Sequence, residues 1–236
     1  MNDIINKPNF IKWFGDWKTG NNCSKVIDKN GMPLVVYHGT NSDFDEFKSE
    51  FMGQTGTALG QGFYFTSRKD EAEYFGNNVK AFYLNIRKPL NSEKVTIKAS
   101  GLSKLIDAID KTQSSFDEDS PYGLLSNYGD VDSNRNGVLR EAVNSILGYS
   151  ENDIDIVGEL INVSGDYDLT VNSLRNVLGY DGIINTERDV YVVHHPNQIK
   201  QINSINFDAN SNKFNESRKK IYISESQFEL LKNRLK

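Results

Sequence analysis

The chain carries strand-like segments near both of its ends and a long helical region between them. β-Branched and aromatic residues concentrate in the strand-like segments, which are 34–37, 63–65, 79–86, 183–185 and 190–195. From about 101 to 170, apolar residues recur at helical spacing, and acidic residues outnumber basic ones. We therefore expect an α+β fold with a mostly helical, acidic insertion between the strands.

Chain length favours one main domain with a short appendage. A chain of 236 residues can bury a sizeable core. We predict a main domain at residues 1–205, with the helical insertion at about 98–176. The tail at 206–236 is expected to hold a short helix, because Ser224 and Gln227 are placed as a capping box.

An amphipathic helix is predicted near the N-terminus. Phe10, Trp13, Phe14 and Trp17 follow the i, i+3, i+4, i+7 spacing of one helical face, and Pro8-Asn9 precedes them as a helix start. Aromatic faces of this kind are normally buried. We expect this face to pack against the body of the domain.

Composition limits the partners and the compartment. A net charge of −5 gives no sequence-wide attraction for nucleic acid or for an anionic membrane. The single cysteine, Cys23, excludes an internal disulfide framework and is consistent with a reducing compartment. The sequence shows no signal-peptide pattern and no apolar stretch of membrane-spanning length. We expect a cytoplasmic protein that does not contact membranes.

Two segments partly resemble metal-binding patterns, and each lacks a ligand that such a site needs. Residues 132–137 (DSNRNG) match the first half of a calcium loop, but Val143 stands where a bidentate carboxylate is needed. His194 and His195 are adjacent, and neighbouring strand residues point to opposite faces. Without clustered cysteine or carboxylate partners, they do not indicate a zinc site. We expect no bound metal.

Two short motifs carry the strongest functional signal. In residues 36–40 (VYHGT), His38 ends an apolar run at a glycine, and in residues 60–66 (GQGFYFT), Tyr64 lies in a glycine-flanked aromatic strand. Their placement between strand-like segments indicates a built site. The chain has no phosphate-binding loop ending in Lys-Ser/Thr, no strand-linked GxGxxG and no GxSxG elbow, which disfavours a hydrolase.

Further motifs accompany these two in order: WFGD at 13–16, SKV at 24–26, YDGII at 180–184, YVV at 191–193 and PNQIK at 196–200. Together they resemble the mono-ADP-ribosyltransferase domains of polyvalent proteins from phages and mobile elements, over roughly residues 9–202. The skeleton is also similar to the diphtheria-toxin-like and poly(ADP-ribose) polymerase class, whose triad is His, Tyr, Glu. The resemblance implies a split β-sandwich around an NAD cleft, with NAD as co-substrate.

The resemblance also implies roles for individual residues. In that class the histidine binds the adenosine ribose, the next glycine holds the nicotinamide amide through its backbone, and the tyrosine stacks on the nicotinamide ring. His38, Gly39 and Tyr64 match these positions, and Tyr74 is placed to complete the stack. The full set of expected NAD contacts beyond His38 and Tyr64 is Tyr37, Gly39, Thr40, Gly62, Phe63, Thr66, Tyr74 and Gln198.

The chain departs from the family pattern at the third triad position. The family's glutamate stands directly before the Tyr-Val-Val strand, where this chain has Val190. Asp189 and Glu187 share the opposite face of a regular strand, so only a bulge or a turn would bring Asp189 into the site. Asp189 or Glu187 could substitute, Gln198 or the target could supply the polar group, or the domain binds NAD with little catalysis.

The expected function is transfer of a single ADP-ribose from NAD to a macromolecular acceptor, with His38, Tyr64 and Asp189 as catalytic residues. Chain elongation is not expected without the glutamate. The acceptor is expected to be a host protein, with nucleic acid left open, and a phage-encoded chain would act in the host-cell cytoplasm. The alternative is a catalytically silent NAD or ADP-ribose binding module that recruits a partner through residues 101–170.

Overall fold

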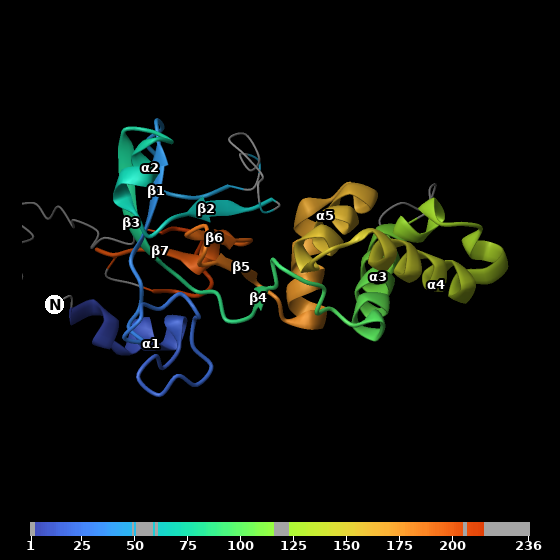
Figure 1. Ribbon diagram of the computed structural model, residues 1–236, viewed down its shortest axis with the longest axis horizontal. Coiled ribbons are helices and arrows are strands. Elements are labelled where there is room, and N and C mark those ends of the chain that lie inside the picture. The colour runs from blue at the N-terminus through green and yellow to red at the C-terminus, as the bar shows by residue number, and fades with distance from the viewer. Residues whose placement is uncertain are drawn as a thin grey trace, which may run out of the picture.

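The computed structural model describes residues 3–48, 50, 59, 61–115, 123–204 and 207–214. Figure 1 shows the strands gathered on one side of the molecule and the longer helices on the other. This arrangement confirms the expected α+β class. The short helix expected around Ser224 lies outside the described residues.

The described residues form seven strands in two sheets. The first sheet has the order β1-β3-β7 and consists of β1 (Val36–Thr40), β3 (Asn78–Leu84) and β7 (Ile199–Gln201). The second has the order β2-β6-β5-β4 and consists of β2 (Phe63–Phe65), β6 (Val190–Val193), β5 (Gly182–Asn185) and β4 (Pro89–Leu90). All neighbouring strands in them are antiparallel except β4 and β5. Within the described residues, a single bridge between Tyr37 and Thr66 joins the two sheets.

An aromatic core fills the space between the sheets. Phe47 lies at its centre, with ring centroids 5.1 Å from Phe63, 5.6 Å from Phe82 and 5.5 Å from Phe214. These edge-to-face contacts are the favoured geometry for aromatic pairs. Phe214 also brings the segment 207–214 onto the first sheet, where buried Lys200 donates through Nζ to the carbonyls of Ser211 and Lys213.

The predicted N-terminal helix is confirmed for Phe10, Trp13 and Phe14, whereas Trp17 lies beyond its end. A 3-10 turn, η1 (Asp3–Asn6), precedes α1 (Pro8–Phe14), and Phe10, Trp13 and Phe14 are all at most 1% exposed. The Trp13 indole nitrogen donates to the carbonyl of Asn197 over 3.0 Å. This bond ties α1 to the turn η5 (Pro196–Gln198), which precedes β7.

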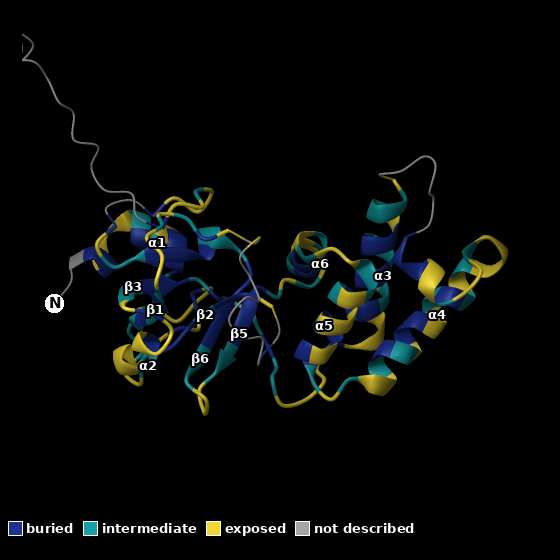
Figure 2. Cartoon of the chain, turned by 90° about the horizontal axis from the view of Figure 1, so that it is seen from above, coloured by how far each residue is buried: buried dark blue, intermediate teal, exposed yellow. Residues whose placement is uncertain are grey.

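A helical layer lies between β4 and β5 in the sequence, where the insertion is expected (Figures 1 and 2). It comprises α3 (Ala99–Ser114), η3 (Leu124–Asn127), α4 (Val131–Tyr149), α5 (Asp153–Ser164), α6 (Tyr167–Ser173) and the π-helix η4 (Leu174–Leu178). Their apolar faces share one core with Ile183 and Val192 of the second sheet. A shorter helix, α2 (Lys69–Glu73), packs on the first sheet.

The calcium-like segment belongs to a helix. Residues 132–137 form the first turns of α4, with a local break at Asn134 (φ −157°, ψ 68°), and Asp130 caps the helix by accepting from the Ser133 amide. The described part of the chain contains no group of three or more His, Cys, Asp or Glu residues placed to hold a metal. Within the same residues, no helix is both long and apolar enough to cross a membrane.

Asp153 fastens the helical layer to the strands. Its side chain is fully buried at the start of α5 and accepts hydrogen bonds from the amides of Asn91, Thr96 and Ile97 and from the Thr96 hydroxyl, over 2.5 to 3.1 Å. These donors belong to the segment between β4 and α3. One carboxylate therefore satisfies four polar groups that are otherwise left in an apolar environment.

We predict that Asp153→Ala lowers the free energy of unfolding by about 3 kcal/mol, because it leaves buried donors unsatisfied. Urea denaturation of the full chain measures this loss. The matched control, Glu159→Ala on the exposed face of the same helix, is expected to change stability by no more than about 0.5 kcal/mol. Equal effects of the two substitutions would contradict the role assigned to Asp153.

Two adjacent histidines follow β6. His194 is 2% exposed and lies against α5. His195 is half-buried, and the positive charge of Arg175 in η4 acts against its protonation. Burial, together with the neighbouring His195, lowers the pKa of His194 to about 3. Burial, together with Arg175, lowers the pKa of His195 to about 4. Both imidazoles are therefore neutral in the folded protein at pH 7.

These lowered pKa values make the fold sensitive to acid. In the unfolded chain a histidine binds its proton near pH 6.5. The contribution of a neutral, buried histidine to the free energy of unfolding is therefore complete above that pH, and it declines as the pH falls towards the pKa of the folded state. For His194 the expected loss between pH 7 and pH 5 is about 2 kcal/mol. Denaturation curves of wild type and His194→Leu at both pH values isolate this contribution, since carboxylate titration is common to both. An identical pH dependence would contradict the burial of a neutral His194.

Candidate active site

The candidate site begins where β1 and β2 come together and then separate. Tyr37 and Thr66 exchange both of their backbone hydrogen bonds, over 2.7 and 3.1 Å. If this antiparallel ladder continued, Gly39 and Tyr64 would form the next hydrogen-bonded pair. Among the described residues, no hydrogen bond joins Gly39 to Tyr64. The two strands therefore separate immediately after one bridge.

The His38 side chain hydrogen-bonds the Tyr64 carbonyl, which a continued ladder between β1 and β2 would need. Its Nδ1 lies 2.8 Å from the carbonyl oxygen of Tyr64, and because a carbonyl only accepts, Nδ1 carries the proton. The ring is enclosed by Phe44, Phe47 and Phe65, with centroids 5.1 to 6.1 Å away. Burial lowers the pKa of His38, nearby Lys80 lowers it further, and the bond to Tyr64 opposes the shift.

Separation of the strands frees the backbone of Gly39. Hydrogen-bond directions alternate along an antiparallel strand, and Tyr37 points its N–H and C=O away from β3, towards Thr66. Gly39, two residues later, points its own N–H and C=O to the same side. Only glycine fits here, since a Cβ would lie 1.7 Å from the carbonyl oxygen of Ala72 in α2. The result is one amide donor and one carbonyl acceptor, side by side.

Tyr64 projects to the face of the second sheet that the helices cover. It lies opposite Val192, and its side chain packs against the same apolar cluster as the helices. The hydroxyl accepts a hydrogen bond from the amide of Leu59 over 3.0 Å. Burial raises the pKa of Tyr64, so its hydroxyl is neutral at pH 7. Thr66, two residues along, has its side chain on this same face.

Asp189 stands at the turn that leads into β6. The next residue, Val190, shares the face of Tyr64 and packs partly buried against the helical cluster. Asp189 has φ +51°, at the end of the turn that connects β5 and β6. This left-handed conformation breaks strand alternation. The carboxylate accepts from the Thr66 hydroxyl (2.7 Å) and the Ser67 amide (3.0 Å).

A second carboxylate stands beside this group. Glu71 of α2 lies 3.2 Å from the Thr66 hydroxyl and pairs with Arg68 at 2.8 Å. The sequence pattern did not single out Glu71 or Ser67, although both follow the motif that contains Tyr64 within seven residues. Glu187, the alternative to Asp189, is exposed in the turn.

Phe63 and Gln198, both expected to contact NAD, belong to the core. Phe63 is 7% exposed and faces the aromatic layer between the sheets, opposite to Tyr64. Gln198 is 1% exposed, and its amide bonds to backbone groups of Asn85, Asp181 and His195. Each side chain is used in packing, and contact of these two residues with NAD stays a prediction.

The remaining expected contacts lie around the junction. The hydroxyl of Thr40 accepts from the Ser42 amide over 3.1 Å. Gly62 lies against Val192, where a Cβ would come within 2.3 Å of the valine. Tyr74 ends α2 and is 88% exposed. Its stacking role stays a prediction.

Comparison with known families identifies the family to which this chain belongs. The sequence model for "ADP-ribosyltransferase in polyvalent proteins" matches residues 28–209, well over half of the chain. Comparisons with curated proteins and with solved structures gave no match. Family membership implies the ADP-ribosyltransferase fold and NAD as co-substrate. The chain belongs to the ADP-ribosyltransferase family of polyvalent proteins.

Proposed function

We propose that this protein transfers one ADP-ribose unit from NAD to a macromolecular acceptor and releases nicotinamide. One observation carries the proposal: the His38 ring takes the carbonyl of Tyr64 and stops the ladder between β1 and β2, which leaves the N–H and C=O of Gly39 unpaired by β2. A primary amide such as that of nicotinamide offers the complementary acceptor and donor. Gly39 can therefore hold the leaving group by two backbone hydrogen bonds.

Tyr64 supports the same reaction by stacking. Tyr64 lies two residues from Thr66 on β2, and Gly39 lies two residues from Tyr37 on β1, so both residues are close to the junction. An aromatic face on the nicotinamide ring contributes about 1 kcal/mol beyond burial of area. Within the described residues, no hydrogen bond engages the second ring nitrogen of His38, Nε2. This nitrogen is available to the ribose, as the family resemblance implies.

Asp189 is proposed to supply the carboxylate that stabilises the transition state. When the bond between nicotinamide and ribose breaks, nicotinamide leaves with the electron pair and positive charge develops on the ribose. A carboxylate near this carbon stabilises the charge, and it accepts the proton that the attacking acceptor loses. Asp189 stands beside Thr66, about 7 Å along β2 from Tyr64. Thr66 and Ser67 fix its orientation.

The acceptor is proposed to be a host protein, with the enzyme acting as an effector in the host-cell cytoplasm. The net charge of −5 supports a protein over nucleic acid, because the chain as a whole repels phosphates. Transfer of one unit, without elongation, fits the absence of the family's glutamate at position 190.

One observation favours a second candidate function. Val190 takes the glutamate position and packs against the helical cluster, so the usual carboxylate is missing. A domain that holds NAD or ADP-ribose without turnover, and recruits a partner through its helical layer, fits this substitution. The two candidates differ in turnover and agree on binding of NAD.

We predict that His38→Ala weakens NAD binding at least tenfold, because the Tyr64 carbonyl is then free to pair with Gly39. His38→Asn places an amide nitrogen where Nδ1 stands and is expected to retain most of the Nδ1-dependent affinity. Isothermal titration calorimetry with NAD measures both, and circular dichroism checks folding. Equal loss in the two variants would contradict the proposed role of the Nδ1 bond.

We predict that Asp189→Asn reduces nicotinamide release from NAD about 100-fold, with the dissociation constant of NAD changed less than about threefold. Asparagine retains an acceptor for Thr66 and Ser67, so the fold should persist. Glu187→Gln, two residues away in the exposed turn, is the matched control and should release nicotinamide at the wild-type rate.

The assay also separates the two candidate functions. Wild-type protein that binds NAD but releases no nicotinamide, with or without host-cell extract, would support the silent module and exclude the transferase. Release that is unaffected by Asp189→Asn would retain the transferase and remove Asp189 from its mechanism.

A further inference from the structure

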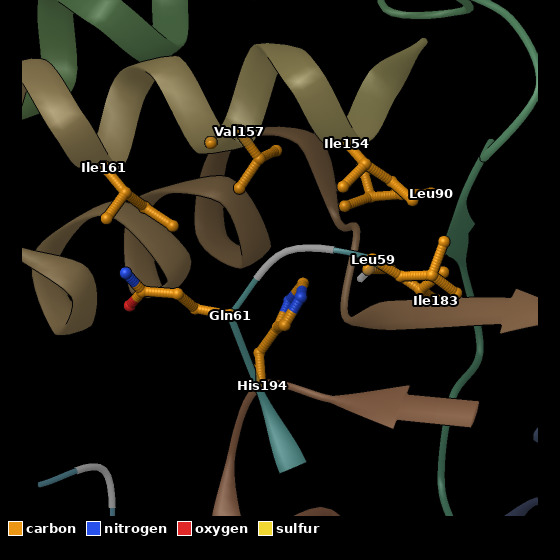
Figure 3. Close-up of a pocket in the computed structure, with 9 residues that line it drawn as sticks. Leu59, Gln61, Leu90, Ile154, Val157, Ile161, Ile183 and His194 are labelled. Atoms are coloured by element: carbon orange, nitrogen blue, oxygen red, sulfur yellow. The ribbon is translucent and has the colours of Figure 1, made fainter. Parts of the chain in front are cut away.

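A cavity lies between the helical layer and the second sheet. Its volume is about 180 Å³, and Figure 3 shows its lining. Aliphatic side chains come from both sides: Leu59, Leu90 and Ile183 from the sheet side, and Ile154, Val157 and Ile161 from α5. None of the expected NAD contacts lines it. Leu59 forms part of its wall and donates to the Tyr64 hydroxyl, so the cavity adjoins the proposed NAD site.

His194 gives this apolar cavity one buried polar group. The imidazole leaves the end of β6 and points towards the side chains of α5 (Figure 3). It is 2% exposed, and its Nδ1 has no hydrogen-bond partner among the described residues. Burial lowers the pKa of His194 to about 3, so at pH 7 the ring has one donor nitrogen and one acceptor nitrogen. Buried polar groups left unpaired are rare, because each costs free energy.

The size and the lining define a class of ligand. A dry aliphatic cavity of about 150 Å³ binds benzene, so this one accommodates a single aromatic ring or an aliphatic group of similar size. Gln61 and Gly158 line it too and are exposed, which places them at its rim. Gly158 leaves this rim open, since no atom lies within 4 Å of a Cβ built there.

We propose that this cavity is a second ligand site, which takes a small, largely apolar molecule whose single hydrogen-bonding group meets His194. The site is independent of NAD chemistry. Its aliphatic walls supply most of the affinity, and the imidazole supplies the preference for a ligand with a polar group.

Phenol and toluene test this proposal, because they share a ring and differ in one hydroxyl. Calorimetric titration of the full chain, without NAD, is expected to show saturable binding of both, with phenol bound about tenfold more tightly. In His194→Leu the two compounds should bind with equal affinity. Absence of saturable binding, or a phenol preference that survives in His194→Leu, would overturn the proposal.

A second pair of variants covers the case in which His194→Leu does not fold. Gly158→Leu extends a side chain over the rim, and leucine favours the helix more than glycine does. Gly158→Leu should weaken the binding of both phenol and toluene at least tenfold. Gly148→Leu in α4 is the matched control, because it also has open surroundings in a helix but lies outside the cavity. Wild-type affinity in Gly158→Leu, or a loss of equal size in Gly148→Leu, would place binding elsewhere and reject the site.

Discussion

The hydrogen bond from His38 to the carbonyl of Tyr64 sets the geometry on which the rest of the site depends. Two neighbouring β-strands ordinarily continue to pair, since every unpaired backbone group in a buried ladder costs free energy. Here the imidazole satisfies the carbonyl at the position where the ladder stops. β1 then stays with the first sheet and β2 with the second, and Tyr37 and Thr66 remain their only bridge within the described residues.

The surroundings of His38 maintain this bond. Aromatic rings enclose the imidazole, and burial with nearby Lys80 lowers the pKa of His38. A neutral ring with its proton on Nδ1 donates to Tyr64 and keeps the other nitrogen as an acceptor. The aromatic core therefore has two functions: it packs the two sheets together, and by burial it favours the neutral form of His38, whose tautomer the Tyr64 carbonyl fixes.

Local patterns in the sequence predicted most elements of the fold and fewer details of the site. The strands at 63–65 and 190–193 and the helical layer could be predicted because their periodicity is carried by neighbouring residues. The contacts of Asp189 could not, because they join segments more than 120 residues apart. Asp189 lies in a turn with positive φ, where the alternation of strand faces does not apply. Phe63 and Gln198 lay inside recognised motifs, yet motif membership does not say which side chains face the core.

The helical layer gives a physical reason for the valine at position 190. β6 is covered on both sides: Tyr191 and Val193 face the aromatic core, whereas Val190 and Val192 face the helices. A glutamate at position 190 would place a charge against an apolar cluster, which is unfavourable without a partner. Valine packs there instead. The left-handed turn at Asp189 then presents a carboxylate one residue earlier, where Thr66 and Ser67 supply the hydrogen bonds that the helical cluster cannot.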